Sequence, residues 1–255
     1  MKSIPERISI RLGLYQRRFI HDPLRSVPEF KDRIDWGMQS LHGNRTLSYQ
    51  VIAENLLFGV QYVAEGVVEG EIAEFGCMTG RTANVISAAM ASFRLDRNLH
   101  LFDSFEGLPE SSSKPDTSSV HVKDGTWGPG TCKGISPAAL RKKCEQYLKA
   151  EQIQIYEGWF SKNMEKIPAK SKFAMLHIDC DLYQSTMDAL DFLFQRKMIS
   201  PGAIILFDDW YCNRSSNEHG ERKAWQELVN KYKISAENLG CYAWGGHKFI
   251  VQSYT

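Results

Sequence analysis

The chain has 255 residues, 43% hydrophobic and 24% charged, a balance typical of a globular protein long enough to form one large α/β domain. Its 31 basic and 30 acidic residues leave a net charge of +1, which excludes a whole-molecule field that would attract nucleic acid or an anionic membrane. We expect a small-molecule substrate. We also expect a cytoplasmic location, because no signal peptide and no apolar run of the ~20 residues that span a bilayer is recognisable. The six cysteines show no CxxC pairing, which favours reduced structural thiols.

Residues 1–45 are predicted to form a helical segment. Apolar residues recur at intervals of three and four from Ile4 to Phe19, with arginines between them, which indicates an amphipathic helix. Such a helix could bind a membrane surface, but packing on the domain or on a partner subunit is favoured, so we expect a lid or a dimer contact. A second helix is predicted from Leu47 to Val63, with Ser48 as a possible cap.

From Glu71 onward, short apolar runs alternate with helical periodicity. The predicted strands are IAEF, LHLF, IQIY, FAMLHI, AIILF, CYAW and KFIVQ, and the predicted helices run to about Phe93 or span 137–149, 184–194 and 220–232. This alternation indicates βαβ units and a doubly wound, mostly parallel sheet. The last two runs flank Gly245-Gly246 and predict an antiparallel edge hairpin. Residues 111–136, rich in Gly, Pro and Ser, predict a lid or a disordered loop.

A glycine-bearing turn follows the first predicted strand. In an open parallel sheet, ligands bind beyond the carboxyl ends of the strands, so the residues that follow each strand are the candidate site. Gly76 and Gly80 would let the backbone approach a ligand, and the next helix would offer free N–H groups to a carboxylate or phosphate. Glu74 would suit a cationic amine. Such turns also join strands to helices without any ligand, and the third glycine of the dinucleotide fingerprint is missing.

Two further strand ends carry candidate nucleoside contacts. Asp103 closes the second strand, where a carboxylate would accept both hydroxyls of a ribose, although a solvated turn aspartate would also fit that place. Gly158 and Trp159 follow the third strand and could flank an adenine ring, although a buried tryptophan is more often part of the core.

The strongest signal is a set of acids after the fourth and fifth strands. FAMLHI runs into Asp179-Cys180-Asp181, and AIILF runs into Asp208-Asp209. Adjacent carboxylates at one sheet edge repel one another and raise each other's pKa values, and a hard divalent cation resolves that repulsion. Mg²⁺ takes oxygen ligands and keeps waters that a substrate hydroxyl can replace. Asp179, Asp208 and Asp209 are therefore the candidate metal ligands.

The strings LFDSFEGLP, GWF, HIDCDLYQST and FDDW, in this order after the glycine turn, closely resemble the macrocin O-methyltransferase family over roughly residues 47–250. The resemblance implies a Rossmann-like class I methyltransferase fold over residues 46–255, S-adenosylmethionine as methyl donor, Mg²⁺, and a sugar hydroxyl as acceptor. By the same resemblance Asp179, Asp208 and Asp209 correspond to the metal ligands and Asp181 to the general base. The glycine turn departs from relatives, since Cys77, Met78 and Thr79 intervene and Arg81 stands where the last glycine is expected.

The predicted function is O-methyl transfer to a small-molecule hydroxyl, in a protein that could form a homo-oligomer. The candidate cofactor-binding residues are Glu74, Gly76, Thr79, Gly80, Arg81, Asp103, Ser104, Gly158, Trp159 and Asp179. In the predicted mechanism the metal orients and acidifies the hydroxyl and Asp181 removes its proton. His100 and His177 lie inside apolar runs, which favours structural roles. Two alternatives stay open: a non-catalytic binding or assembly protein with this fold, and an NAD-dependent oxidoreductase.

Overall fold

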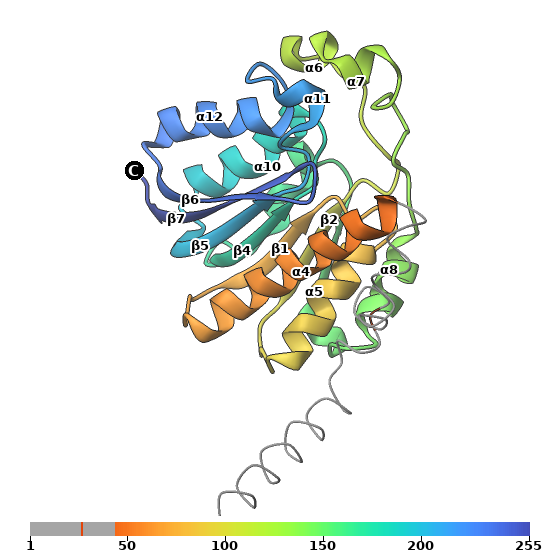
Figure 1. Cartoon of the computed structure of the whole chain (residues 1–255). Coiled ribbons are helices and arrows are strands. Elements are labelled where there is room, and N and C mark those ends of the chain that lie inside the picture. The colour runs from red at the N-terminus through yellow and green to blue at the C-terminus, as the bar shows by residue number, and fades with distance from the viewer. Residues whose placement is uncertain (1–26, 28–43) are drawn as a thin grey trace, which may run out of the picture.

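The computed structural model describes Val27 and residues 44–255, so the predicted helix at 4–19 lies outside the described residues, as does nearly all of the 1–45 segment. The described chain is built around one seven-stranded sheet with strand order β3-β2-β1-β4-β5-β7-β6 (Figure 1). The strands are β1 (Glu71–Phe75), β2 (Leu99–Asp103), β3 (Ile153–Glu157), β4 (Phe173–Ile178), β5 (Ile199–Phe207), β6 (Ser235–Tyr242) and β7 (Gly246–Ser253). The first five are parallel, whereas β7 pairs antiparallel with both β5 and β6. The predicted doubly wound sheet with an antiparallel edge hairpin is confirmed.

Helices cover both faces of the sheet (Figure 1). The helices are α4 (Asn44–Glu65), α5 (Arg81–Ser92), α6 (Lys114–Ser118), α7 (Val120–Lys123), α8 (Pro137–Cys144), η2 (Ala150–Gln152), α9 (Phe160–Asn163), η3 (Met164–Lys166), α10 (Tyr183–Gln195), α11 (Cys212–Ser215) and α12 (Gly220–Tyr232). Helices α4, α5 and α8 pack on one face, and α10 and α12 pack on the other. No helix within residues 44–255 combines the length and apolar character needed to cross a membrane.

The alternation of side chains along the strands divides the core into two layers. On β5, Ile204 and Leu206 face the α4–α5 layer, while Ile205 and Phe207 face the α10–α12 layer. All six residues of β4 are buried because this strand lies in the middle of the sheet with helices on both sides. Such continuous burial explains why the sequence FAMLHI lacks a polar–apolar alternation.

The segment between β2 and α8, residues 104–136, contains α6 and α7 and is called the covering segment below. Its base is closed by two backbone hydrogen bonds, from Leu108 N to Thr131 O at 2.8 Å and from Gly130 N to Leu108 O at 2.9 Å. Trp127 lies in a small apolar cluster with Leu182 and Cys212, which precede α10 and begin α11. Figure 1 shows α6 and α7 beyond one end of the sheet, beside α11. The loop predicted at 111–136 therefore has helical structure and packed contacts of its own.

Candidate active site

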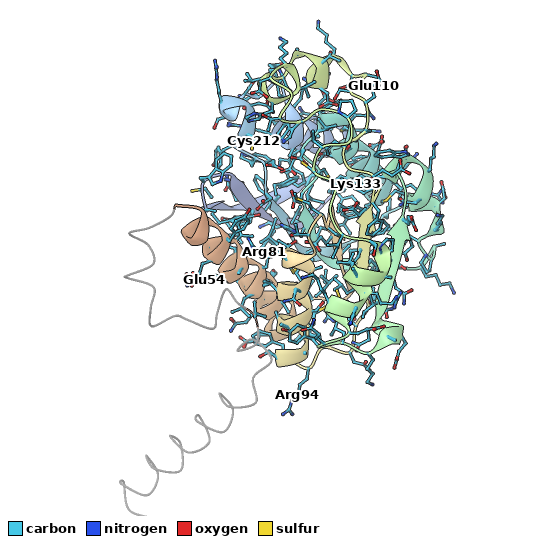
Figure 2. All side chains as sticks on the ribbon, turned by 90° about the vertical axis from the view of Figure 1, so that its right-hand side faces the viewer. Glu54, Arg81, Arg94, Glu110, Lys133 and Cys212 are labelled. Atoms are coloured by element: carbon cyan, nitrogen blue, oxygen red, sulfur yellow. The ribbon has the colours of Figure 1, made fainter. Side chains whose placement is uncertain are left out.

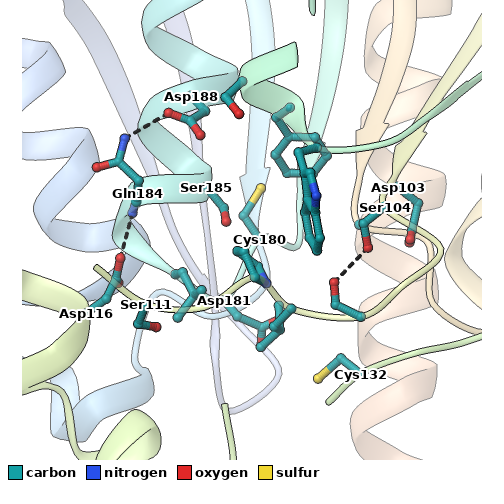
Figure 3. Close-up of a pocket in the computed structure, with 18 of the residues that line it drawn as sticks. Asp103, Ser104, Ser111, Asp116, Cys132, Cys180, Asp181, Gln184, Ser185 and Asp188 are labelled. Atoms are coloured by element: carbon teal, nitrogen blue, oxygen red, sulfur yellow. Dashed lines mark hydrogen bonds between the residues drawn. The ribbon is translucent and has the colours of Figure 1, made fainter. Parts of the chain in front are cut away.

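A pocket of about 540 Å³ lies at the carboxyl ends of β1, β2, β3, β4 and β5, in the size range of ligand sites in enzymes. Eight of the predicted site residues line it: Gly76, Asp103, Ser104, Gly158, Trp159, Asp179, Asp181 and Asp209. In Figure 3, Asp103 and Ser104 stand at one end, Gln184 and Asp188 at the other, and Asp181 between them. Glu74, Thr79, Gly80, Arg81 and Asp208 are not among its lining residues. The sheet thus gathers strand ends as far apart in sequence as Phe75 and Phe207.

Gly76 is required by the protein's own backbone. Its φ is +90°, and a Cβ added there would lie 1.9 Å from the carbonyl oxygen of Asp179. Only glycine allows the turn after β1 to pass this close to the loop after β4. Gly80, with φ +67°, is crowded by Leu140 of α8, whose Cδ1 would be 2.8 Å from an added Cβ. The two glycines predicted to admit a ligand therefore admit neighbouring protein atoms, and Gly76 also borders the pocket.

The first turn of α5 lies beside this glycine turn but faces solvent. Thr79 and Arg81 are exposed, and the Arg81 guanidinium sits over the ring of Tyr49 in α4, 4.0 Å from its centroid. Figure 2 places Arg81 at the start of α5, next to α4. The structure therefore places Arg81 between two helices, and its cofactor role stays a prediction.

Asp103 ties the end of β2 to the glycine turn. Its Oδ2 accepts hydrogen bonds from Cys77 N at 2.7 Å and Met78 N at 3.0 Å, and its Oδ1 accepts one from Phe105 N at 2.6 Å. The carboxylate borders the pocket. Oδ2 already accepts two hydrogen bonds, whereas Oδ1 accepts one and retains a lone pair for a ligand hydroxyl. Ser104 is less available, since its hydroxyl donates to Gly107 O at 2.7 Å. Asp103 thus has a structural role that does not exclude the predicted ribose contact.

A buried side-chain amide fixes the conformation of the loop after β3. Asn163, which is 1% exposed, donates from Nδ2 to Tyr156 O at 3.0 Å and to Gly158 O at 2.9 Å. Gly158 has a φ of +117°, and a Cβ there would meet no atom within 4 Å, so the glycine leaves open space at the pocket wall. Trp159 follows on the same wall. This part of the pocket is lined by Trp159 and Phe160, whose rings suit a stacked ring system.

Three carboxylates converge at the centre of the pocket. One oxygen each of Asp179, Asp181 and Asp209 lies within 4.8 Å of the others. Asp181 has a left-handed backbone with φ +59°, a conformation that aspartate tolerates better than most residues. Burial, followed by repulsion from Asp209 and Asp208, raises the pKa of Asp181 well above its usual range. Burial and the same two neighbours raise the pKa of Asp179 as well.

Asp208 lies beside a different polar group. Its Oδ1 is buried and has no hydrogen-bond partner among the described residues, and burial raises its pKa to about 6. Close by, His177 Nδ1 and Glu74 Oε1 are 2.9 Å apart, and both side chains are fully buried. Burial alone would lower the pKa of His177, but the hydrogen bond and charge of Glu74 raise it. Glu74 therefore sits within the protein, away from the pocket lining, and its predicted contact with a ligand amine stays a prediction.

The donor set fits a hard divalent cation. All three converging atoms are carboxylate oxygens, the ligand type of Mg²⁺, Mn²⁺ and Ca²⁺. Within residues 44–255 no ion pair joins a lysine or arginine to any of these acids. The structure brings together two of the three predicted ligands, Asp179 and Asp209, with the predicted base Asp181, and it leaves Asp208 outside the group. The ligand set and the base assignment stay predictions.

The pocket also contains polar residues that the sequence reasoning missed. Ser111 and Asp116 come from the covering segment, and Gln184 and Asp188 come from the first turns of α10 (Figure 3). Gln184 Nε2 donates to Asp188 Oδ1 at 2.8 Å. The signal that could have found them is the i, i+4 spacing of Gln184 and Asp188, which places both on one helix face directly after the acidic loop.

Comparison with known proteins identifies similar sequences among natural-product methyltransferases. The sequence profile of the Macrocin-O-methyltransferase (TylF) family matches residues 40–240. The 8-demethyl-8-(2,3-dimethoxy-alpha-L-rhamnosyl)-tetracenomycin-C 4'-O-methyltransferase of Streptomyces olivaceus is 30% identical over 162 residues, which are 62% of this chain and 59% of that relative. The match thus spans about three fifths of that relative's length. The mycinamicin III 3''-O-methyltransferase of Micromonospora griseorubida is 24% identical over 186 residues, 69% of this chain and 72% of the relative.

Solved structures share the fold. The O-methyltransferase NovP superposes with a TM-score of 0.67 at 23% identity and covers 80% of this chain and 81% of its own. The calicheamicin methyltransferase CalS11 superposes with a TM-score of 0.63 at 19% identity and covers 98% of this chain and 94% of its own. At these identities the superpositions show a shared class I O-methyltransferase fold.

Proposed function

The chain belongs to the macrocin O-methyltransferase family, and from that premise we propose that it transfers the methyl group of S-adenosylmethionine to a hydroxyl group of a sugar or glycosylated natural product. The observation that carries the proposal is the meeting of Asp179, Asp181 and Asp209 in the same pocket as Asp103 and Gly158. One end of that pocket offers a carboxylate and aromatic side chains, which suit a nucleoside, and the centre offers acids.

The acceptor class rests on the relatives. The two relatives from Streptomyces olivaceus and Micromonospora griseorubida are named as O-methyltransferases, and the name of the first includes a rhamnosyl group. The polar side chains at the far end of the pocket, Ser111, Gln184 and Asp188, are suited to the several hydroxyls of a sugar. A hydroxyl-rich acceptor would make better use of these groups than an apolar one.

Asp179 and Asp209 would hold a divalent cation, since both the sequence pattern and the geometry select them. When bound, the cation would lower the pKa of an acceptor hydroxyl and favour its ionised form. Asp181 lies within the same group of oxygens, close enough to accept the proton of a hydroxyl seated between the three acids. Trp159 and residues of the covering segment line the same pocket.

The test is a methyl-transfer assay with radiolabelled S-adenosylmethionine and a panel of nucleotide-linked sugars, glycosides and catechols. Catechols belong in the panel because vicinal ring hydroxyls present the same oxygen pair as a sugar diol. We expect transfer to at least one sugar acceptor, its loss with EDTA, and its return with Mg²⁺. Calorimetry should show binding of S-adenosylhomocysteine. Selective binding of NADH would favour an oxidoreductase, and cofactor binding without transfer to any acceptor would favour a non-catalytic protein.

A further inference from the structure

Glu221 lies at the start of α12, is fully buried, and is not part of the pocket lining. Its carboxylate spans the two acidic loops. Oε1 accepts a hydrogen bond from Cys180 N at 3.1 Å, and Oε2 accepts one from Asp209 N at 3.0 Å. One side chain from a third element thus joins the loop after β4 to the loop after β5.

Glu221 links the two loops beyond the end of the β4–β5 hydrogen-bond ladder. The β4–β5 pairing ends at Ile178 and Phe207, and Asp208 N donates the last ladder bond to Ile178 O at 2.9 Å. Beyond that point Asp181 and Asp209 contact each other directly, and Glu221 links the two loops from a third element. The carboxylate of Glu221 therefore helps to set the separation of Asp179 and Asp181 from Asp209.

The start of α12 is shaped to bring this carboxylate into place. Gly220 has a φ of +56°, and a Cβ there would lie 3.3 Å from the Asp181 carbonyl oxygen, so the helix begins directly against the acidic loop. A glutamate in the first turn of a helix ordinarily interacts with that helix's own free N–H groups. Glu221 instead gives both oxygens to other loops, which separates its role from ordinary helix capping.

A charged carboxylate is electrostatically unfavourable at this position. Glu221 adds a fully buried acid beside four others, and burial, followed by repulsion from Asp209, raises its pKa. A glutamine of the same shape would avoid the charge but would offer only one acceptor oxygen, so it could not satisfy both backbone N–H groups. The site requires two acceptors on one rigid planar group.

We propose that Glu221 is a positioning residue that fixes the distance between the two acidic loops so that their carboxylates bind one divalent cation. The inference rests on the proposed cation-dependent function. Residues that orient metal ligands without touching the metal commonly change its affinity by 10–100-fold when they are replaced.

The experiment compares Glu221→Gln with wild type in two kinds of measurement, ligand affinity and amide hydrogen exchange. Mn²⁺ affinity, measured by electron paramagnetic resonance, should fall on the order of tenfold or more, while S-adenosylhomocysteine affinity stays within about threefold. Amide hydrogen exchange at Cys180 and Asp209 should accelerate, because one of their two acceptors is lost. Glu218→Gln is the matched control: it removes the same charge from an exposed residue near the start of α12 and should change neither measurement.

Glu221→Asp separates geometry from charge and serves if the glutamine variant does not fold. It keeps the charge but is one methylene too short to reach both loops, so Mn²⁺ affinity should fall as in Glu221→Gln. Wild-type affinity in Glu221→Asp would overturn the bridging role in favour of charge alone. Unchanged exchange at Cys180 and Asp209 would overturn the inference even if the cation binds. Absence of Mn²⁺ binding by the wild-type protein would overturn the cation proposal itself, and with it this inference.

Discussion

At the scale of single residues, Asp181 combines an unusual backbone with an exceptional electrostatic position. A non-glycine residue in the left-handed region stores strain, and such strain persists where the surroundings fix it for function. From α12, Glu221 accepts a hydrogen bond from the preceding residue, Cys180, and Gly220 lies close to the Asp181 carbonyl oxygen. The identity of Asp181 as base can therefore be tested without disturbing its backbone, since asparagine tolerates the same conformation.

Asp181→Asn should lower kcat by about 10²–10⁴-fold, because the amide cannot accept the acceptor's proton. Mn²⁺ affinity should stay within about threefold of wild type, whereas Asp179→Asn should weaken it strongly. Steady-state kinetics and Mn²⁺ titration of both variants provide the check, with Asp208→Asn as a third arm for the predicted ligand. Equal losses of Mn²⁺ affinity in Asp181→Asn and Asp179→Asn would make Asp181 a ligand.

His100, which lies away from the pocket, should make the free energy of unfolding depend on pH. It is 2% exposed, its Nδ1 lies 3.0 Å from the Tyr156 hydroxyl, and burial lowers its pKa to about 4. In the unfolded chain His100 has an ordinary pKa of about 6.5. The stability that neutral, buried His100 contributes is therefore complete above about pH 6.5 and is lost as the pH falls toward 4. The loss should reach about 3 kcal/mol.

The measurement is urea unfolding of wild type and His100→Phe between pH 7 and pH 4. A phenylalanine keeps the ring contacts with Tyr156 and Phe173 but cannot take up a proton. The difference between the two unfolding free energies removes the contribution of the acidic cluster, which both proteins share. Parallel pH profiles for the two proteins would contradict the assignment.

Which site residues the sequence could reveal depends on how each acts. The acids after β4 and β5 are recognisable because four carboxylates directly after two apolar runs are hard to explain by solvation alone. No sequence pattern marks Glu221, because it is one glutamate in the polar helix start GERK. Only the fold brings it against the acidic loops. Gly76 was predicted to let the backbone approach a ligand, whereas the atom that a Cβ would meet there is the Asp179 carbonyl oxygen.

At the scale of elements, the covering segment is fixed to α10 by one carboxylate. Asp116 is 2% exposed, and its Oδ1 and Oδ2 accept hydrogen bonds from Tyr183 N at 2.8 Å and Gln184 N at 3.1 Å. Leu182 precedes α10 and has no side chain that could cap the helix. The cap is therefore supplied by a residue about 67 positions earlier in the chain, which couples the covering segment to the helix behind the acidic loop.

Asp116→Asn should destabilise this coupling by about 1–2 kcal/mol, since one of the two N–H groups loses its acceptor. We expect faster limited proteolysis within residues 104–136 and a higher KM for the acceptor. Asp124→Asn is the control in the same segment, because Asp124 is exposed and accepts hydrogen bonds only within its own turn. Equal proteolysis rates for the two variants would argue against the coupling of the covering segment to α10 by Asp116.

Element boundaries followed from the sequence where burial is uniform and failed where it is not. The apolar runs of β1, β2 and β4 were located to within a residue or two, because both faces of these strands are buried. β3 was located equally well although it is a partly exposed edge strand, because IQIY is itself largely apolar. β6 begins at Ser235, six residues before the predicted CYAW, because an edge strand with exposed faces needs no apolar pattern. The helix α6 was missed although Ser113 and Asp116 form an N-terminal capping pattern, since the surrounding serines and glycines suggested a loop.

At the scale of the whole molecule, the concentration of acids at one sheet edge makes folding and cation binding interdependent. A cation that binds only the folded protein stabilises it by about 2.7 kcal/mol at 100 times its Kd. Mg²⁺ or Mn²⁺ should therefore raise the melting temperature, and EDTA should reverse the shift. Thermal denaturation at matched ionic strength, with NaCl in the control, separates binding from screening. Asp179→Asn should show no cation-dependent shift, and a shift of wild-type size there would contradict the proposed site.

Fold class was accessible from the sequence because the alternation of strands and helices leaves few topologies for a parallel sheet. Strand order, however, places β1 between β2 and β4 and thereby joins the two halves of the chain. Nothing in the local pattern of IAEF specifies FAMLHI as its neighbour, so the convergence of the glycine turn with the acidic loops required the three-dimensional structure.

The β1–β4 pairing has a consequence for the order of assembly. Glu74 faces His177 across this pairing, 103 residues later in the chain. During synthesis, β1, β2 and β3 can form a three-stranded half sheet before Phe173 has emerged, and its apolar β1 edge then has no neighbour. In this state the unpaired backbone groups of β1 can pair with strands of other nascent chains until β4 pairs with β1. Slow elongation between β3 and β4 would therefore favour aggregation over native assembly.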